Sequence, residues 1–253
     1  MLNMQTYGDT TNQPTLLIAH GLFGSGRNWR AIAKRLSSDR QVITVDMRNH
    51  AGSFWDDDHS YPALADDLAH CLEKIEGPVD VLGHSMGGKA AMVLALRNPP
   101  NMNRLIVADI APVTYTHSQM PNIRAMQAVD IANITRRSEA EKSLSDSVKD
   151  TASRAFLVQS LELSEKGARW TLNLDALADN MDDVIGFPEI SGVFQNDVLF
   201  IKGSLSDYVL PEYMPNIQRL FPNVGVQEIE GANHWVHAEK PRAFIEMTAR
   251  FLS

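Results

Sequence analysis

The sequence predicts an α/β fold in which a mostly parallel central sheet is flanked by helices and carries a helical cap as an insertion. Three observations predict this fold. Short apolar runs alternate with helix-like segments toward both ends of the chain, as they do in βαβ units. A glycine-rich turn that contains a serine, 83–87, joins one apolar run to a helical one. Between residues 113 and 188 the alternation stops, and polar, helix-forming sequence replaces it.

The first 112 residues contain four apolar runs with the composition of buried strands. Parallel strands that are covered on both faces read as continuous apolar runs. The segments between these runs repeat apolar residues at helical spacing. The predicted strands are 16–20, 41–45, 79–82 and 104–109, and the predicted helices are 28–36, 61–75 and 86–96.

The middle of the chain is interpreted as a cap that lies over the strand ends, although a helical subdomain with no role at the site is the alternative. Its helices are predicted at 123–134, 138–163 and 174–184, and no strand pattern is visible there. The sheet resumes after the cap, with strands predicted at 198–202 and 224–229, a helix ending at 221 and a last helix at about 240–252. The predicted division is a core of residues 1–112 and 189–253 and a cap of residues 113–188.

The glycine-rich turn carries the candidate nucleophile, Ser85. Gly83 and Gly87 stand two positions before and after it, in the pattern Gly-x-Ser-x-Gly. A tight strand-to-helix elbow strains the backbone at the serine, and larger flanking side chains would collide there. The hydroxyl then stands clear of the sheet, and the N–H groups that begin the following helix favour developing negative charge.

A serine hydroxyl is a weak nucleophile until an oriented base takes its proton. His234 is the candidate base because it lies in the loop after the last predicted strand. An oxyanion hole needs two N–H donors, and one is predicted to be the backbone of Met86, directly after the nucleophile. The other should come from the loop after the first buried strand, where Leu22 is the first choice and Phe23 the alternative.

The acid that would orient this base has two candidates. Asp109 follows the strand after the elbow, and Asp207 lies in the loop after the next strand, which is the commoner place for such an acid. Ligands of parallel sheets bind at the carboxyl ends of the strands, so His20, Asp46 and both acids are expected at one edge. The residues alone leave this choice open.

Composition excludes several function classes. The net charge is −8, which argues against a surface for nucleic acid or for an anionic membrane. The single cysteine, Cys71, rules out an internal disulfide and fits a reducing compartment. No signal sequence or membrane span is recognisable, and no Cys/His cluster has zinc-ligand spacing, so we expect a cytoplasmic protein without a metal. The oligomeric state stays open.

Five motifs occur along the whole chain in an order that resembles α/β-hydrolases. More narrowly, they are similar to the YbfF-type esterase/thioesterase branch. The motifs are His20-Gly-Leu-Phe-Gly, Asp46-Met-Arg-Asn-His, Gly83-His-Ser-Met-Gly-Gly-Lys, Val107-Ala-Asp-Ile-Ala-Pro-Val and Gly231-Ala-Asn-His-Trp-Val-His-Ala-Glu-Lys-Pro.

The resemblance implies a serine hydrolase with Ser85 as nucleophile and His234 as base. In this branch the acid is expected at Asp109, because Ser206 occupies the acid position of the more general pattern and Asp207 lies one residue late. The implied substrates are small-molecule carboxylic esters, and possibly acyl-CoA thioesters, with short to medium acyl chains, cleaved through an acyl-enzyme without a cofactor. Hydrolysis of C–C bonds and perhydrolysis are alternatives on the same residues, and a non-catalytic ligand-binding protein is an alternative of another class.

Other polar residues receive structural interpretations. His84 is expected to pack beneath the elbow, and Trp235 and His237 to support His234. Lys89 is interpreted as a helix-surface lysine, with attraction of an anionic substrate group as the less favoured alternative.

Two polar segments are interpreted in the same way. The turn 46–50 is expected to tie loops together, and 56–59 to be a solvated acidic loop rather than a metal site.

Overall fold

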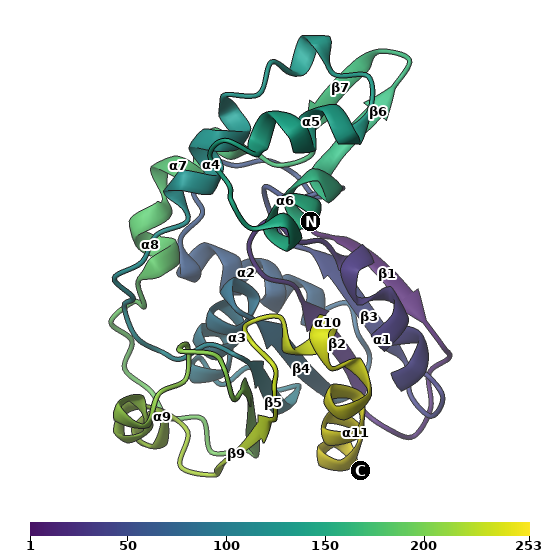
Figure 1. Cartoon of the computed structure of the whole chain (residues 1–253). Helices are drawn as coiled ribbons and strands as arrows, with labels where there is room; N and C mark the ends of the chain where they lie inside the picture. The colour runs from purple at the N-terminus through teal and green to yellow at the C-terminus, as the bar shows by residue number, and fades with distance from the viewer.

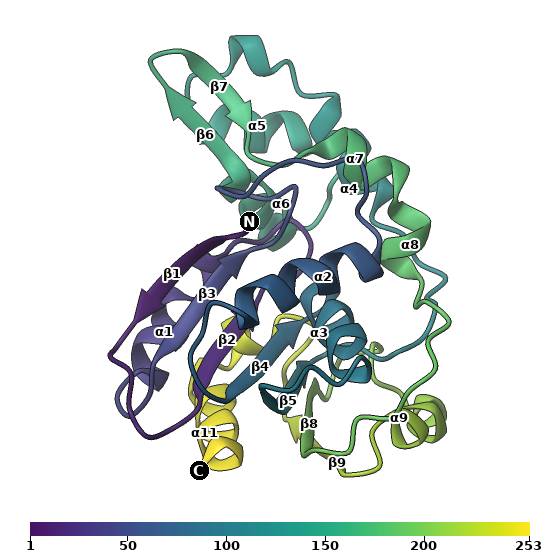
Figure 2. The ribbon, with the colours of Figure 1, turned by 180° about the vertical axis from the view of Figure 1, so that it is seen from behind.

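Seven strands form the central sheet of the computed structural model, which describes residues 1–253 (Figures 1 and 2). The strand order is β1-β3-β2-β4-β5-β8-β9, and every neighbouring pair is parallel except β1 with β3. This arrangement confirms the predicted fold class. The strands are β1 (Asn3–Tyr7), β2 (Thr15–Ala19), β3 (Val42–Asp46), β4 (Val79–His84), β5 (Met102–Ala108), β8 (Val198–Gly203) and β9 (Val224–Ile229).

Apolar side chains cover both faces of the sheet. Along β2, Leu17 and Ala19 belong to one buried cluster and Leu16 and Ile18 to another, because successive side chains of a strand point to opposite faces. One cluster packs beneath α2 (Tyr61–Leu72), α3 (Met86–Leu96) and α9 (Met214–Leu220). The other packs beneath α1 (Arg30–Leu36) and α11 (Pro241–Leu252). Burial on both faces explains why these strands read as continuous apolar runs.

The segment between β5 and β8 lies beyond the carboxyl ends of the strands and has an apolar cluster of its own (Figure 1). A 3₁₀ turn, η1 (Gly26–Trp29), leads into α1, and η4 (Pro211–Tyr213) leads into α9. The short helix α10 (Val236–Glu239) follows β9. The elements of the inserted segment are α4 (Met120–Gln127), η2 (Ile131–Asn133), α5 (Arg137–Leu144), α6 (Thr151–Leu157), η3 (Val158–Ser160), β6 (Leu161–Ser164), β7 (Gly167–Trp170), α7 (Leu174–Asp179) and α8 (Met181–Ile185).

The prediction that this segment contains no strand was wrong. β6 and β7 form an antiparallel hairpin in which Leu161 pairs with Trp170 and Leu163 with Ala168. All four side chains belong to the cap cluster or pack against it. Apolar residues therefore alternate with polar ones along both strands, but each strand is too short for the alternation to stand out in the sequence. The long helix predicted at 138–163 is therefore two short helices followed by a strand.

The antiparallel edge strand β1 was also missed. Only Tyr7 of its five residues is buried, so the apolar pattern that marks the inner strands is absent. No helix in the structure combines the length and the apolar character needed to cross a bilayer.

Candidate active site

Ser85 occupies the elbow between β4 and α3 in a strained conformation, with φ 52° and ψ −120°. Few non-glycine residues adopt a positive φ. The elbow is too crowded for side chains on the neighbouring glycines. A Cβ at Gly83 would lie 2.2 Å from the carbonyl oxygen of Gly87, and one at Gly87 would lie 2.5 Å from that of Ala19. The flanking glycines therefore allow the tight turn that presents the Ser85 hydroxyl at the sheet edge.

The structure brings Ser85, His234 and Asp109 into one hydrogen-bonded chain. His234 Nε2 lies 3.0 Å from Ser85 Oγ, and Nδ1 lies 2.8 Å from Asp109 Oδ2. An ionised carboxylate only accepts hydrogen bonds, so the Nδ1 proton faces Asp109 and Nε2 is free to accept the serine proton. Asp207 is exposed and makes no hydrogen bond to His234. Of the two candidate acids, Asp109 alone contacts the base.

Two further donors hold the Asp109 carboxylate, which is fully buried. The N–H of Gly203 donates to Oδ1 at 2.9 Å, and the Ser206 hydroxyl donates to Oδ2. Ser206 occupies the acid position of the more general pattern. In this structure its hydroxyl donates to Asp109, the candidate acid that follows β5.

Aromatic rings fix the position of His234. The Tyr208 ring stacks on the imidazole with centroids 3.9 Å apart, a contact that the sequence analysis missed because Tyr208 follows a polar loop. His84 lies beneath the elbow and donates from Nε2 to the carbonyl oxygen of His234 at 3.0 Å. His237 makes no hydrogen bond to His234; its ring stacks on Trp29 at 4.2 Å and packs edge-on against His84.

The buried environment of His84 and His237 favours the neutral form of both rings. Burial lowers the pKa of His237 to about 3, and it lowers the pKa of His84 well below its usual value. A cation in either position would be desolvated and would face the ring of His234. The rings of His84 and His237 therefore pack beside the site without adding positive charge to it.

The predicted oxyanion donors differ in whether their N–H groups already have an acceptor. Met86 opens α3, so its N–H has no acceptor within the helix. In the loop after β2, the N–H of Phe23 donates to His50 Nε2 at 3.2 Å, whereas the N–H of Leu22 has no partner. Of the two predicted loop donors, Leu22 is therefore the one available to a ligand.

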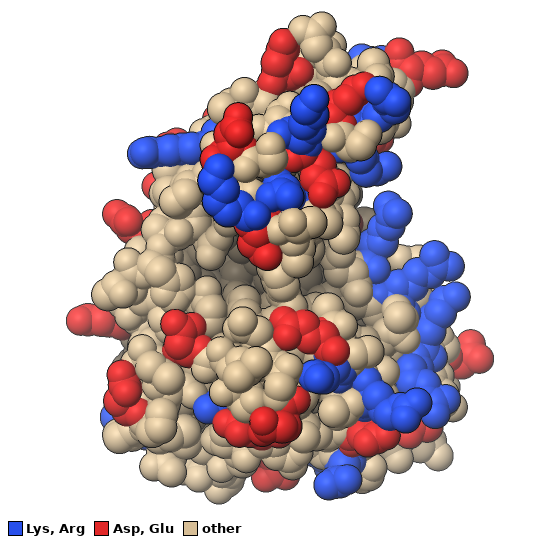
Figure 3. Space-filling model, viewed as in Figure 1, with Lys and Arg blue, Asp and Glu red and all other residues tan.

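A pocket of about 260 Å³ opens directly above Ser85 and His234. Core and cap both contribute to its walls, and Figure 3 shows the surface hollowed between them. Phe156 of α6 packs against Trp235 across this boundary, with ring centroids 5.3 Å apart. Thirteen of the 25 lining residues are hydrophobic, so the pocket suits a mainly apolar group.

The interpretation of Lys89 was wrong. Lys89 is completely buried rather than on the helix surface, and its ammonium group donates to the carbonyl oxygens of Ile185 and Gly186. Every residue of α3 is buried, and the apolar sequence around Lys89 on all sides was the signal for this. In the segment 56–59 the three aspartates are exposed, as expected of a solvated acidic loop, whereas His59 is buried. No group of three or more His, Cys, Asp or Glu side chains lies where it could hold a metal ion.

Comparison with known proteins agrees with this architecture. Residues 14–241 match the family described as the alpha/beta hydrolase fold. The chain is 40% identical over 257 residues to the sn-1-specific diacylglycerol lipase ABHD11 of Mus musculus, a match that covers 97% of this chain and 83% of that protein. It is 34% identical over 254 residues to Esterase YbfF of Escherichia coli (strain K12), which covers 100% of this chain and 98% of that protein.

A solved structure described as a marine microorganism esterase is also similar. It has a TM-score of 0.93 and 37% sequence identity, over 99% of this chain and 98% of that one. These similarities confirm the resemblance inferred from the motifs.

Proposed function

The chain belongs to the alpha/beta hydrolase fold family and is a carboxylic ester hydrolase, and we propose that it acts through Ser85, His234 and Asp109 by way of an acyl-enzyme. The observation that carries this proposal is the hydrogen-bonded chain from Ser85 Oγ through His234 to Asp109, in which Ser85 and His234 line a partly apolar pocket. The two distances lie within the range expected of a nucleophile, its base and the group that orients the base.

Acylation uses each group in one role. His234 Nε2 takes the Ser85 proton as Oγ attacks the ester carbonyl carbon, and Asp109 stabilises the imidazolium that forms. The carbonyl oxygen becomes an oxyanion, which accepts hydrogen bonds from the N–H groups of Leu22 and Met86. The C–O bond to the alcohol then breaks, and His234 returns its proton to the leaving oxygen.

Deacylation repeats these steps with water. His234 takes a proton from a water molecule, whose oxygen attacks the acyl carbon of the Ser85 ester. The second oxyanion uses the same two N–H groups. The Ser85 oxygen leaves, takes the proton back from His234, and the carboxylic acid is released.

The pocket supports a short to medium acyl chain. Its volume of about 260 Å³ lies below the usual range of roughly 300–1,000 Å³ for small-molecule sites. We propose that residues 113–188 act as a cap on the core of 1–112 and 189–253, because α6 and α8 supply part of the pocket wall. Thioesters are a proposed second substrate class, since the same attack on an acyl carbon expels a thiol.

Steady-state hydrolysis of p-nitrophenyl esters from acetate to palmitate, with the matching acyl-CoAs, tests the proposal. Wild-type protein should prefer a chain of short or medium length. Ser85→Ala should lower kcat at least about 10³-fold, because the nucleophile and its base act as one unit. Both proteins are purified identically, so that contaminating host esterases contribute equally. Retained activity in Ser85→Ala contradicts the mechanism, and turnover of a diketone panel without ester turnover favours C–C bond hydrolysis.

A further inference from the structure

Three neighbouring histidines that the proposed mechanism does not use lie near the loop after β2. This loop, residues 21–23, contains the proposed oxyanion donor and is called the oxyanion loop below. His20, His50 and His59 are almost completely buried. The ring centroids of His20 and His50 are 5.1 Å apart, and those of His50 and His59 are 5.7 Å apart. Burial lowers the pKa of all three, so the rings are neutral and each has one donor and one acceptor nitrogen.

Hydrogen bonds define the tautomers of the two histidines that touch the oxyanion loop. His50 donates from Nδ1 to the carbonyl oxygen of Arg48 at 2.8 Å, so its Nε2 is an acceptor, and it accepts from the N–H of Phe23 at 3.2 Å. His20 accepts from the N–H of Met47 on Nε2 at 2.9 Å and donates from Nδ1 to the carbonyl oxygen of Gly21 at 2.8 Å. The two rings therefore bind successive peptide groups of the loop, His20 the carbonyl oxygen of Gly21 and His50 the N–H of Phe23.

These bonds orient the N–H of Leu22. In a trans peptide the C=O of Gly21 and the N–H of Leu22 point in opposite directions. The side of the peptide that faces His20 is occupied by the carbonyl, so the Leu22 N–H points away from that ring. Phe23 has a φ of 64°, a conformation that a bulky residue adopts only when its surroundings impose it. The bond from its N–H to His50 holds its backbone, and its side chain is buried in the cap cluster.

We propose that His50 is a positioning residue for the oxyanion hole: its Nε2 holds the Phe23 peptide, so that the Leu22 N–H stays aimed at the substrate carbonyl oxygen. The proposal rests on the proposed function, because it assumes that Leu22 is an oxyanion donor. His50 does not touch the substrate, since it is absent from the pocket wall.

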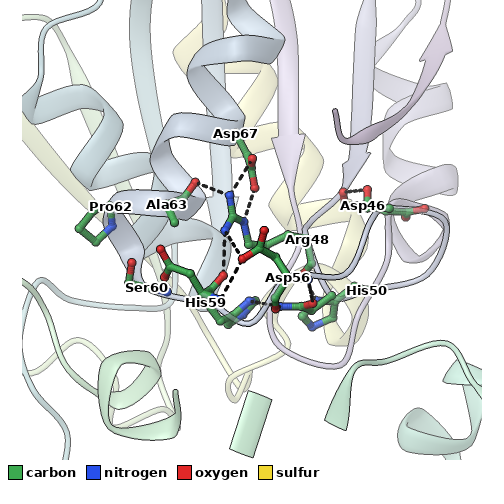
Figure 4. Close-up of polar contacts among 12 residues, drawn as sticks. Asp46, Arg48, His50, Asp56, His59, Ser60, Pro62, Ala63 and Asp67 are labelled. Carbon is green, nitrogen blue, oxygen red and sulfur yellow. Dashed lines mark hydrogen bonds and ion pairs between the residues drawn. The ribbon is translucent and has the colours of Figure 1, made fainter. Parts of the chain in front are cut away.

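The side of His50 that faces away from the loop is rigidly anchored (Figure 4). The guanidinium group of Arg48, whose carbonyl oxygen accepts the His50 Nδ1 proton, binds both carboxylate oxygens of Asp67 on α2, and it also donates to the carbonyl oxygens of Asp58 and Ala63. Bidentate pairs of this kind fix geometry as well as adding energy. The anchor explains how one imidazole can hold a strained loop.

The backbone of the same turn also binds the cap. The N–H of Ala51 donates to the carbonyl oxygen of Thr171 at 2.7 Å, and the N–H of Asn173 donates to that of Asn49 at 3.0 Å. These bonds involve main-chain atoms only. Replacing the His50 side chain therefore leaves the cap contact in place. It removes the bond to the carbonyl oxygen of Arg48 and the bond from the Phe23 N–H.

Two substitutions separate the hydrogen bond from the bulk of the ring. His50→Gln can place an amide oxygen near the Nε2 position and keep an acceptor for the Phe23 N–H. His50→Met fills a similar volume without a strong acceptor. We expect His50→Met to lower kcat about 10- to 100-fold, because a donor displaced by 1 Å can cost about 100-fold, with KM changed by less than roughly threefold. His50→Gln should recover most of the lost activity.

Affinity for an alkylboronic acid is the second readout, because its tetrahedral adduct with Ser85 places an oxygen in the oxyanion hole. Boronic acid affinity should fall in His50→Met in proportion to kcat/KM and should recover in His50→Gln. Leu220→Ala is the control for general destabilisation. Leu220 is buried in α9, away from the pocket wall, so this variant should melt at a lower temperature and keep wild-type kcat.

A folded His50→Met protein with wild-type kcat and boronic acid affinity overturns the proposal. Equal losses in His50→Gln and His50→Met also overturn it, because they show that the acceptor for the Phe23 N–H makes no difference. Failure of the proposed function looks different, since it appears as ester activity retained in Ser85→Ala or as no ester activity in the wild type. The boronic acid titration requires no turnover, so it still tests His50 if the wild type forms the Ser85 adduct but hydrolyses no ester.

Discussion

Asp109 is a residue whose position has to be held by its neighbours. Its φ of 51° costs a non-glycine residue roughly 1–2 kcal/mol. Gly203, Ser206 and His234 all donate to its carboxylate, which fixes the side chain at the end of β5. A buried carboxylate needs such partners, because burying a polar group without hydrogen bonds costs free energy.

Asp109→Asn should therefore damage catalysis far more than Asp207→Asn. An amide at position 109 can present its NH₂ group to His234 and so select the wrong tautomer, which typically lowers kcat about 10⁴-fold. Asp207 is exposed and should be replaceable with little change. Ester hydrolysis by the two purified variants measures the difference. Comparable losses in both would show that Asp109 is not the acid.

Among the elements, the elbow between β4 and α3 depends most on glycine. Gly83 lies so close to α3 that any side chain would meet backbone atoms rather than a flexible group. The turn cannot relax without moving Ser85 or the start of α3, which are adjacent in the chain. The packing of Gly83 is therefore coupled to the position of the proposed nucleophile.

Gly83→Ala should destabilise the fold by about 3 kcal/mol or more, the upper part of the range for overpacking. Its Cβ would lie 2.2 Å from the carbonyl oxygen of Gly87. Gly225→Ala is the matched control, because a Cβ there meets only Leu199 at 4.0 Å, and it should be neutral or slightly stabilising. Urea denaturation measures both. Equal midpoints for the two variants would contradict the crowding argument.

At the scale of the whole molecule, Lys89 links the core to the cap. It rises from α3 and donates to the carbonyl oxygens at the end of α8, where cationic groups suit the negative end of a helix. The ammonium group also lies 4.7 Å from the centre of the Tyr115 ring. Burial nevertheless lowers the pKa of Lys89 from 10.5 to about 7. The hydrogen bonds of Lys89 to the cap therefore do not fully replace the hydration that its ammonium group loses on burial.

The stability of the protein should respond to pH through this lysine. Between pH 7 and 10.5 the unfolded chain holds more protons at Lys89 than the folded protein, so the free energy of unfolding rises with pH across this window. The slope contributed by this one group is at most about 1.4 kcal/mol per pH unit. Urea denaturation of wild type and Lys89→Met at pH 7, 8 and 9 isolates this contribution, because other groups titrate equally in both proteins. Parallel pH dependences in the two proteins would contradict it.

Local motifs and hydrophobic periodicity were sufficient to predict the fold class, the elbow at Ser85 and the place of His234. Apolar runs alternating with helical segments determined the α/β class, because a sheet buried on both faces requires them. The glycine spacing around Ser85 marked the elbow, because only a residue without a Cβ fits there. The place of His234 after the last strand followed from chain order, since the carboxyl ends of parallel strands meet at one edge.

Only the tertiary structure decided which side chains meet. The residues alone left the choice between Asp109 and Asp207 open, and the resemblance favoured Asp109; the burial of Asp109 against His234 distinguishes them in the structure. The burial of Lys89 and the bond from His50 to Phe23 depend on segments distant in sequence, which packing brings together. Periodicity reports which face of an element is covered, but the partner that covers it is set by the three-dimensional arrangement of the whole chain.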